Sequence, residues 1–337
     1  MSLTSPASKL THYLINHPET LVHRKQHGFT YPVHAEIDLT WRCALNCKGC
    51  HSKWLHSGAE LQPDQIKTIL TELHAHGLEA VTFSGGGDPM ESPHFEYAVN
   101  FAADLGLSMG LYTYFPNPTQ QRVSYLDSKF DWIYSHPFQA KQFHRFKKWI
   151  ENLDLEKNTI GYWESRSHWT VGFLLDSDNW HKATEMAAKV DLNFFDGVDF
   201  RPLCPENKPD AKPMNYGWVE NAIRLLKQLS DEPRITWSEY KFNGLLNGGK
   251  REYDKCLSTD LVALVGPDGM MYECVQRRGY PDSTLGNLLT ESLEDIWRRK
   301  SHCRTDLESC RILCRNDQDN VALYQLLGPA PKHASFL

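Results

Sequence analysis

The stretch HAEIDLTWRCALNCKGC, residues 34–50, combines the features that decide the fold. Residues 34–40 alternate apolar and polar side chains, a pattern that predicts a β-strand. Three cysteines follow closely, Cys43, Cys47 and Cys50, with C-x3-C-x2-C spacing. A strand that runs directly into a cysteine-rich loop indicates chemistry at the end of that strand, which is where parallel α/β barrels keep their active sites.

Strands and helices alternate from this stretch onward. Further strands are expected at residues 79–83, 108–114, 130–135, 169–175 and 198–203, and helices at 63–76, 95–105, 138–153, 181–190 and 217–229. Alternation of this kind requires a parallel sheet with helices packed outside it. Six strands between residues 34 and 203 therefore predict an α/β protein built on a partial TIM-type (β/α)6 barrel.

Composition narrows the classes of protein that the chain can be. Hydrophobic residues make up 41% and charged residues 23% of the 337 positions, values typical of a folded globular protein. The net charge of -6 argues against a general nucleic-acid binder, which usually carries a basic surplus. No run of 18 apolar residues and no N-terminal signal pattern is present. We therefore expect a cytoplasmic protein that does not span a membrane.

The number of cysteines points away from disulfides. Nine is an odd number, and a reducing cytosol disfavours disulfide frameworks. Three of the nine lie in the first loop and five in the C-terminal quarter of the chain. Clustering of this kind is typical of metal or iron–sulfur ligation.

The first cluster of cysteines fits a [4Fe–4S] centre with one open iron. Ordinary clusters of this type are held by four thiolates, whereas this loop supplies three. The fourth iron would then be free to chelate a small ligand and pass an electron to it. Zinc, with His51 or a distant residue as partner, and a chance grouping of cysteines are the alternatives.

A second motif follows the second expected strand. Residues 84–88 read Ser84, Gly85, Gly86, Gly87 and Asp88. A glycine run taken alone indicates only a turn. At the end of a barrel strand, however, glycines allow the backbone to approach a ligand closely.

Together these motifs resemble those of the radical S-adenosylmethionine (SAM) superfamily. The resemblance implies that Cys43, Cys47 and Cys50 hold a [4Fe–4S] cluster whose open iron binds the amino and carboxylate groups of SAM. It also implies that the backbone of residues 84–88 receives the amino group of the methionine moiety. Reductive cleavage of SAM then yields a 5′-deoxyadenosyl radical that abstracts hydrogen from a substrate. Two residues depart from the common pattern: Gly49 stands where an aromatic residue is frequent, and Asp88 where Glu is common.

Other strand ends offer further candidate residues. Ser135, at the end of the fourth strand, suits a contact with a ribose hydroxyl, and Arg201 suits bidentate pairing with a carboxylate. Cys204 follows the sixth strand, and its thiol is a candidate hydrogen-atom donor to a substrate radical. The alternative for Ser135 and Arg201 is a solvated or structural role, and for Cys204 a buried apolar position.

The C-terminal cysteines form a second pattern. Residues 261–265 and 270–274 predict a β-hairpin with cysteines near its outer ends, and a helix is expected at 293–300. The spacing C-x12-G-x4-C from Cys256 to Cys274 resembles the auxiliary-cluster extension called SPASM, or its shorter form, twitch. The resemblance implies one auxiliary [4Fe–4S] cluster, with Cys256, Cys274, Cys310 and Cys314 as ligands. Cys303 is the spare, or replaces Cys310. A structural zinc site with the same thiolates is the alternative.

We therefore expect three segments: an N-terminal lead-in (1–30), a radical SAM partial barrel (31–235) and a small hairpin-and-helix auxiliary-cluster domain (236–337). The expected activity is oxidation or epimerisation of a small-molecule or peptide substrate, which makes the chain an oxidoreductase or epimerase. A flavodoxin or ferredoxin would supply the electrons. The competing hypothesis is a non-enzymatic iron–sulfur or zinc protein that senses redox state and binds a partner.

Overall fold

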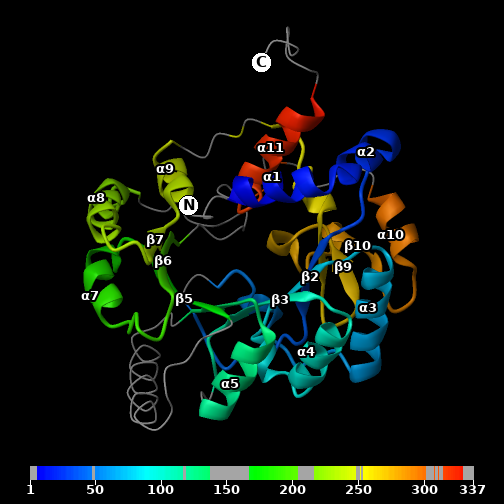
Figure 1. Ribbon diagram of the computed structural model, residues 1–337, viewed down its shortest axis with the longest axis horizontal. Coiled ribbons are helices and arrows are strands. Elements are labelled where there is room, and N and C mark those ends of the chain that lie inside the picture. The colour runs from blue at the N-terminus through cyan, green and yellow to red at the C-terminus, as the bar shows by residue number, and fades with distance from the viewer. Residues whose placement is uncertain are drawn as a thin grey trace.

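One mixed sheet of ten strands organises the molecule, with helices around its outside (Figure 1). The computed structural model describes residues 6–47, 50–116, 119–136, 167–203, 216–247, 251, 253–300, 307, 310 and 314–328. The strands, in chain order, are β1 (His34–Asp38), β2 (Ala80–Ser84), β3 (Ser108–Thr113), β4 (Trp132–Ser135), β5 (His168–Leu175), β6 (Gly197–Pro202), β7 (Ile235–Trp237), β8 (Val262–Val265), β9 (Met270–Tyr272) and β10 (Thr284–Asn287).

The order of the strands is that of an open parallel barrel extended at one edge. Across the sheet they run β10-β9-β8-β1-β2-β3-β4-β5-β6-β7. Strands β1 to β7 pair in parallel with their neighbours, and β8 also pairs in parallel with β1. Strands β8, β9 and β10 pair antiparallel. All six expected barrel strands are present, and β7 is a short seventh strand that the sequence analysis did not find.

Helices begin where local chemistry caps their first turn. Gln62 and Gln65 form a capping box ahead of α3, whose first residue is Pro63. The hydroxyl of Ser292 accepts a hydrogen bond from the Asp295 amide and caps α10. The helices are α1 (Pro6–Asn16), α2 (Pro18–His27), α3 (Pro63–Ala75), α4 (Phe95–Asp104), α5 (Gln120–Lys129), α7 (Ala183–Ala188), α8 (Val219–Leu229), α9 (Glu239–Leu246), α10 (Leu293–Arg299) and α11 (Asp317–Leu327).

Most helix predictions agree with the structure. The expected helices at 63–76, 95–105, 181–190, 217–229 and 293–300 correspond to α3, α4, α7, α8 and α10, and the lead-in contains α1 and α2. The sequence analysis missed α5, α9 and α11, while the helix expected at 138–153 lies outside the described residues. Within the part of the chain that the structure describes, no helix has the length and apolarity needed to cross a membrane.

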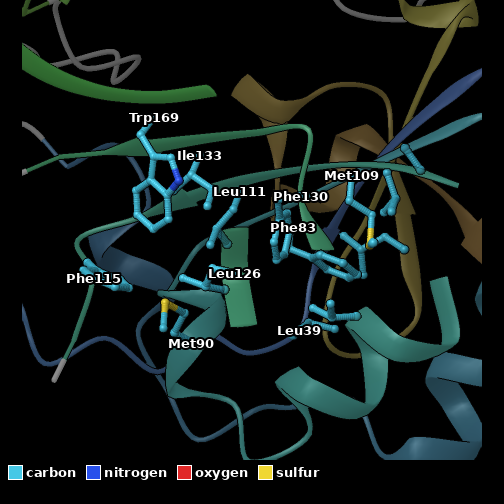
Figure 2. Packing of buried hydrophobic residues seen from close by; sticks show 14 of the residues in the cluster. Leu39, Phe83, Met90, Met109, Leu111, Phe115, Leu126, Phe130, Ile133 and Trp169 are labelled. Atoms are coloured by element: carbon cyan, nitrogen blue, oxygen red, sulfur yellow. The ribbon is translucent and has the colours of Figure 1, made fainter. Parts of the chain in front are cut away.

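The main hydrophobic core lies between the outer face of the sheet and the surrounding helices. Figure 2 shows Phe83, Leu111 and Ile133 of the sheet among Met90 and Leu126 from the outer layer. Successive residues of a strand point to opposite faces. In β1, Ala35 and Ile37 therefore join the core, whereas His34, Glu36 and Asp38 face the barrel interior. The interior of the barrel is polar where it faces β1.

Two glycines make room for aromatic rings inside the barrel. A Cβ on Gly110 would lie 2.1 Å from the Trp132 ring, and one on Gly172 would lie 2.0 Å from the Tyr134 ring. Real Cβ atoms do not come so close to neighbouring atoms, so each glycine is required by the ring beside it. These rings narrow the barrel below its mouth.

The C-terminal segment is joined to the barrel through the sheet itself. Strand β8 extends the sheet at β1, with Glu36 in register with Leu264. At the other edge, β7 begins at Ile235, where the barrel was expected to end, and the Ser238 amide donates to the Phe200 carbonyl of β6. Elements on either side of residue 235 thus share one sheet, and the expected domain limits stay a prediction.

Candidate functional site

The loop with the first three cysteines follows β1 and is tied down at several points. The Cys50 amide donates to the Cys47 carbonyl at 3.4 Å, and the Ala44 amide donates to Glu91 Oε1 at 2.7 Å. Cys43, Cys47 and Cys50 are partly buried, and none of them forms a disulfide with another described residue. The structure therefore places all three on one loop above β1, with their sulfurs available as ligands.

The glycine turn after β2 lies directly against this loop. The Asp88 amide donates to the Arg42 carbonyl at 2.8 Å, and the Gly86 amide donates to Asp38 Oδ2 at 3.0 Å. A Cβ on Gly87 would lie 2.1 Å from the Arg42 carbonyl oxygen. The turn and the cysteine loop therefore approach each other more closely than any side chain at position 87 would allow.

We expect Gly87→Ala to separate the turn from the cysteine loop. Overpacking of this kind costs about 1–3 kcal/mol of the free energy of unfolding. Thermal unfolding of the metal-free chain should show a lower Tm for this variant. Gly58→Ala is the matched control, because nothing lies within 4 Å of a Cβ at that position. Equal melting temperatures for the two variants would contradict this account of the close approach.

The side chain of Asp88 forms hydrogen bonds to other residues of the protein. It accepts hydrogen bonds from the Thr113 hydroxyl at 2.8 Å, the Tyr114 amide at 2.7 Å and the Met90 amide at 2.9 Å. Burial raises the pKa of this carboxyl to about 7. Asp88 therefore fastens the glycine turn to the end of β3, while the backbone of the turn faces the cysteine loop.

Ser135 and Arg201 lie at the ends of β4 and β6, as expected, but their surroundings differ. Ser135 is 3% exposed, and no partner for its hydroxyl oxygen exists among the described residues. Arg201 Nε lies 2.6 Å from Asp199 Oδ2, and its guanidinium stacks 4.3 Å from the centre of the Tyr134 ring. The positive charge of Arg201 is thus already neutralised by Asp199, whereas the Ser135 hydroxyl can still form a hydrogen bond with a ligand.

Four C-terminal cysteines come together from distant parts of the chain. Cys256 precedes β8, Cys274 follows β9, and Cys314 precedes α11. Burial, together with the nearby Cys256 and Cys310, raises the pKa of the Cys274 thiol to about 12. Burial and the neighbouring Cys274 and Cys256 also raise the pKa of Cys314. The structure thus gathers the four predicted auxiliary ligands, while Cys303 and Cys204 lie outside the described residues.

Polar groups already point at two of these sulfurs. The Asn320 side-chain amide donates to Cys256 Sγ at 3.4 Å, and the Asn316 amide donates to Cys314 Sγ at 3.4 Å. Such donors stabilise thiolates and tune the potential of an iron–sulfur centre. Four neighbouring thiols of this kind suit a metal centre, whose binding would displace their protons.

The thiols of both cysteine groups could bind either kind of centre that the sequence suggests. A structural zinc ion takes four thiolates, and a [4Fe–4S] cluster takes three or four. Among the described residues, no group of three His, Cys, Asp or Glu side chains is arranged around a single metal ion.

Comparison with known proteins agrees with this arrangement. Residues 256–320 match the SPASM family model, described as an iron–sulfur cluster-binding domain. A PqqA peptide cyclase from Bradyrhizobium diazoefficiens is 35% identical over 100 residues, which are 29% of this chain and 26% of that protein. A second, from Rhodopseudomonas palustris, is 36% identical over 87 residues, 25% of this chain and 23% of the relative. The chain thus matches about a quarter of the length of these curated relatives.

Solved structures with the same fold cover more of the chain. SuiB of Streptococcus suis bound to the precursor peptide SuiA has a TM-score of 0.64 at 13% identity, over 85% of this chain and 69% of SuiB. The structure of anSMEcpe with bound AdoMet has a TM-score of 0.62 at 14% identity, over 82% of this chain and 83% of that one.

The fold and the cysteine groups define the class of protein. The chain has the fold of a radical SAM enzyme, a partial TIM-type barrel with an auxiliary domain, which confirms the predicted fold class and resemblance. Its C-terminal part is an iron–sulfur cluster-binding domain of the SPASM type. The predicted cofactors, SAM and [4Fe–4S] clusters including an auxiliary one, agree with these matches.

The sequence analysis missed the charged residues that join the two cysteine groups. Glu36 and Asp38 of β1 are 3% and 0% exposed, and they pair with Arg315 and Arg278 from the C-terminal domain. One signal was available: polar residues at alternate positions of a strand whose other face is apolar indicate a polar barrel interior. Their arginine partners lie more than 200 residues away, and no local pattern indicates them.

Proposed function

We propose that this protein is a radical SAM enzyme that modifies a peptide. The observation that supports this most is the contact between the three-cysteine loop and the glycine turn at neighbouring strand ends, held by Asp88 and Asp38. The partial likeness to PqqA peptide cyclases favours a peptide over the other expected substrate, a small molecule.

Each residue of the site has a distinct task in this proposal. Cys43, Cys47 and Cys50 hold the first cluster, and the backbone of residues 84–88 receives the methionine end of SAM. The unpartnered hydroxyl of Ser135 is available to a ribose hydroxyl. A cluster held by these cysteines would, when reduced, supply the one electron that splits SAM into methionine and a 5′-deoxyadenosyl radical, and this radical would take a hydrogen atom from the substrate. Arg201, already paired with Asp199, more readily orders the barrel wall than binds a carboxylate.

The auxiliary centre and Cys204 distinguish two outcomes of the reaction. Cys256, Cys274, Cys310 and Cys314 hold a second cluster, which suits removal of an electron from a substrate radical and thus oxidation. Cys204 suits the transfer of a hydrogen atom to the radical, and thus epimerisation. A small reduced protein of the flavodoxin or ferredoxin type, cytoplasmic like the enzyme, supplies the electrons in either case.

The substrate class can be tested with the anaerobically reconstituted, dithionite-reduced protein. Candidate peptides, aminosugars and nucleosides are added separately with SAM, and 5′-deoxyadenosine is quantified by mass spectrometry. Peptides should raise its formation well above the level without substrate, and the mass of the consumed peptide should change. Stimulation by aminosugars or nucleosides alone would overturn the peptide assignment.

We expect Cys204→Ala to separate the two outcomes. In an epimerase, the thiol gives its hydrogen atom to the substrate radical, and an electron from the donor protein with a proton from solvent restores it. The variant would then keep both clusters and form 5′-deoxyadenosine, yet release no epimerised product. In D2O the wild type would place one deuterium at the reacting carbon. Normal turnover by the variant would exclude this role and favour oxidation through the auxiliary cluster.

A further inference from the structure

Two arginines from the C-terminal domain reach into the barrel. Arg278 follows Cys274 by four positions, and Arg315 directly follows Cys314. Strands β9 and β10, which flank Arg278 in the chain, continue the sheet beyond β8, which pairs with β1 at the edge of the barrel (Figure 1). Both guanidinium groups therefore belong to segments that carry auxiliary-cluster cysteines, while their partners belong to the barrel.

Arg278 contacts three parts of the SAM site at once. Its Nε lies 2.9 Å from Asp38 Oδ2, and its Nη2 donates to Asp38 Oδ1 at 3.1 Å. Its Nη1 donates to the Gly85 carbonyl at 3.3 Å and lies 3.4 Å from His51 Nε2. One side chain, 5% exposed, thus joins the end of β1, the glycine turn and the residue after Cys50.

Asp38 extends these contacts to the backbone of the turn. Besides Arg278, it accepts hydrogen bonds from the Gly86 amide at 3.0 Å and from the Trp41 indole at 3.3 Å. All of these partners are N–H donors, which suit an ionised carboxylate because it is a pure acceptor. Arg278 and Asp38 together fix both polar groups of the peptide unit between Gly85 and Gly86, the carbonyl and the amide.

The two arginines neutralise the buried carboxylates of β1. Glu36 pairs with Arg315, and Arg278 Nη2 also lies 3.5 Å from Glu36 Oε2. Burial alone would raise the pKa of Glu36, but the positive charges of Arg315 and Arg278 outweigh it and lower that pKa. Without the two arginines, two buried carboxylates would face each other unpaired, which is strongly unfavourable.

We propose that Arg278 is a positioning residue that couples the auxiliary-cluster segment to the SAM-binding turn. The proposal deepens the proposed function and rests on it. The hairpin segment that ends at Cys274 sets the place of Arg278, which in turn holds the Gly85 carbonyl and orients the turn. Because coupling of this kind is reciprocal, SAM at the turn also stabilises the docked C-terminal segment.

The test measures binding of SAM to the full chain reconstituted with both clusters. Dissociation constants are obtained by equilibrium dialysis without reductant, so that no turnover enters the result. Arg278→Met should raise the Kd for SAM at least tenfold while about eight irons per chain remain. Arg278→Lys, which keeps the charge but loses the forked donors, should fall between that variant and the wild type. Arg298→Met is the control, since Arg298 pairs with Glu294 on the exposed face of α10.

A second pair of variants keeps the test valid if Arg278→Met does not fold. Asp38→Asn removes the buried charge that Arg278→Met would leave unpaired, so the double variant should fold where the single one does not. If Arg278 holds the Gly85 carbonyl, adding Arg278→Met to Asp38→Asn should weaken SAM binding further. Binding unchanged between these two proteins would overturn the proposal, as would loss of the first cluster in every Arg278 variant. Failure of the wild type itself to bind SAM would instead contradict the proposed function.

Discussion

Replacement of Cys43, Cys47 and Cys50 by alanine should abolish cleavage of SAM and remove about half of the iron. The three cysteines of the first loop lie partly buried beside the glycine turn and, among the described residues, form no disulfide. Without them no iron lies next to the turn, so no electron can reach SAM there. Two cubes hold about eight irons, and the variant should therefore retain about four.

Iron analysis and quantification of 5′-deoxyadenosine after reduction by dithionite check this expectation. The auxiliary cluster is the internal control, because the variant should keep it along with the visible absorbance of one cluster. A triple variant that still cleaves SAM at the rate of the wild type would show that the first loop has been misassigned.

The second large effect is expected at the other cysteine group. Cys274→Ala should lower the iron content from about eight to about four per chain while the first cluster survives. Cys274 is partly buried and lines a small cavity together with Arg315 and Asn316, and its thiol lies near those of Cys256 and Cys310. Loss of one of the four ligands leaves one iron of this cluster without a thiolate, and at this site no SAM is expected to take its place.

The triple variant of the first loop is the reciprocal control for this experiment, since each protein should keep the cluster that the other loses. Cys256→Ala should behave like Cys274→Ala, because both residues belong to the same group. One stoichiometric zinc in the anaerobically purified wild type, in place of the second four irons, would be incompatible with an auxiliary iron–sulfur cluster.

The sequence predicted the parts of this site that depend on local chemistry. Cysteine ligands to one cluster must lie within reach of each other, so Cys43, Cys47 and Cys50 are recognisable from spacing alone. The glycine turn was found for a similar reason, because only glycine tolerates the 2.1 Å approach of the Arg42 carbonyl at position 87. Alternating strands and helices indicated the barrel through their hydrophobic period.

Such patterns do not predict contacts between residues that are far apart in the sequence. Asp38 and Arg278 are 240 positions apart, and neither residue type predicts its partner. Arg201 illustrates the opposite case, in which a signal was present but not used. Asp199 precedes it by two positions on the same strand, so both side chains face the same side of the sheet and pair. The expectation that Arg201 binds a carboxylate of a ligand did not consider this neighbour.

The central claim is that the three-cysteine loop and the glycine turn together cleave SAM, and one measurement tests it most directly. The wild-type protein is reconstituted anaerobically, reduced with dithionite and mixed with SAM, and methionine and 5′-deoxyadenosine are quantified together. The account predicts that both products form in equal amounts and that neither forms in the triple cysteine variant. Protein that carries both clusters and leaves SAM intact would contradict the account and would favour an iron–sulfur redox sensor.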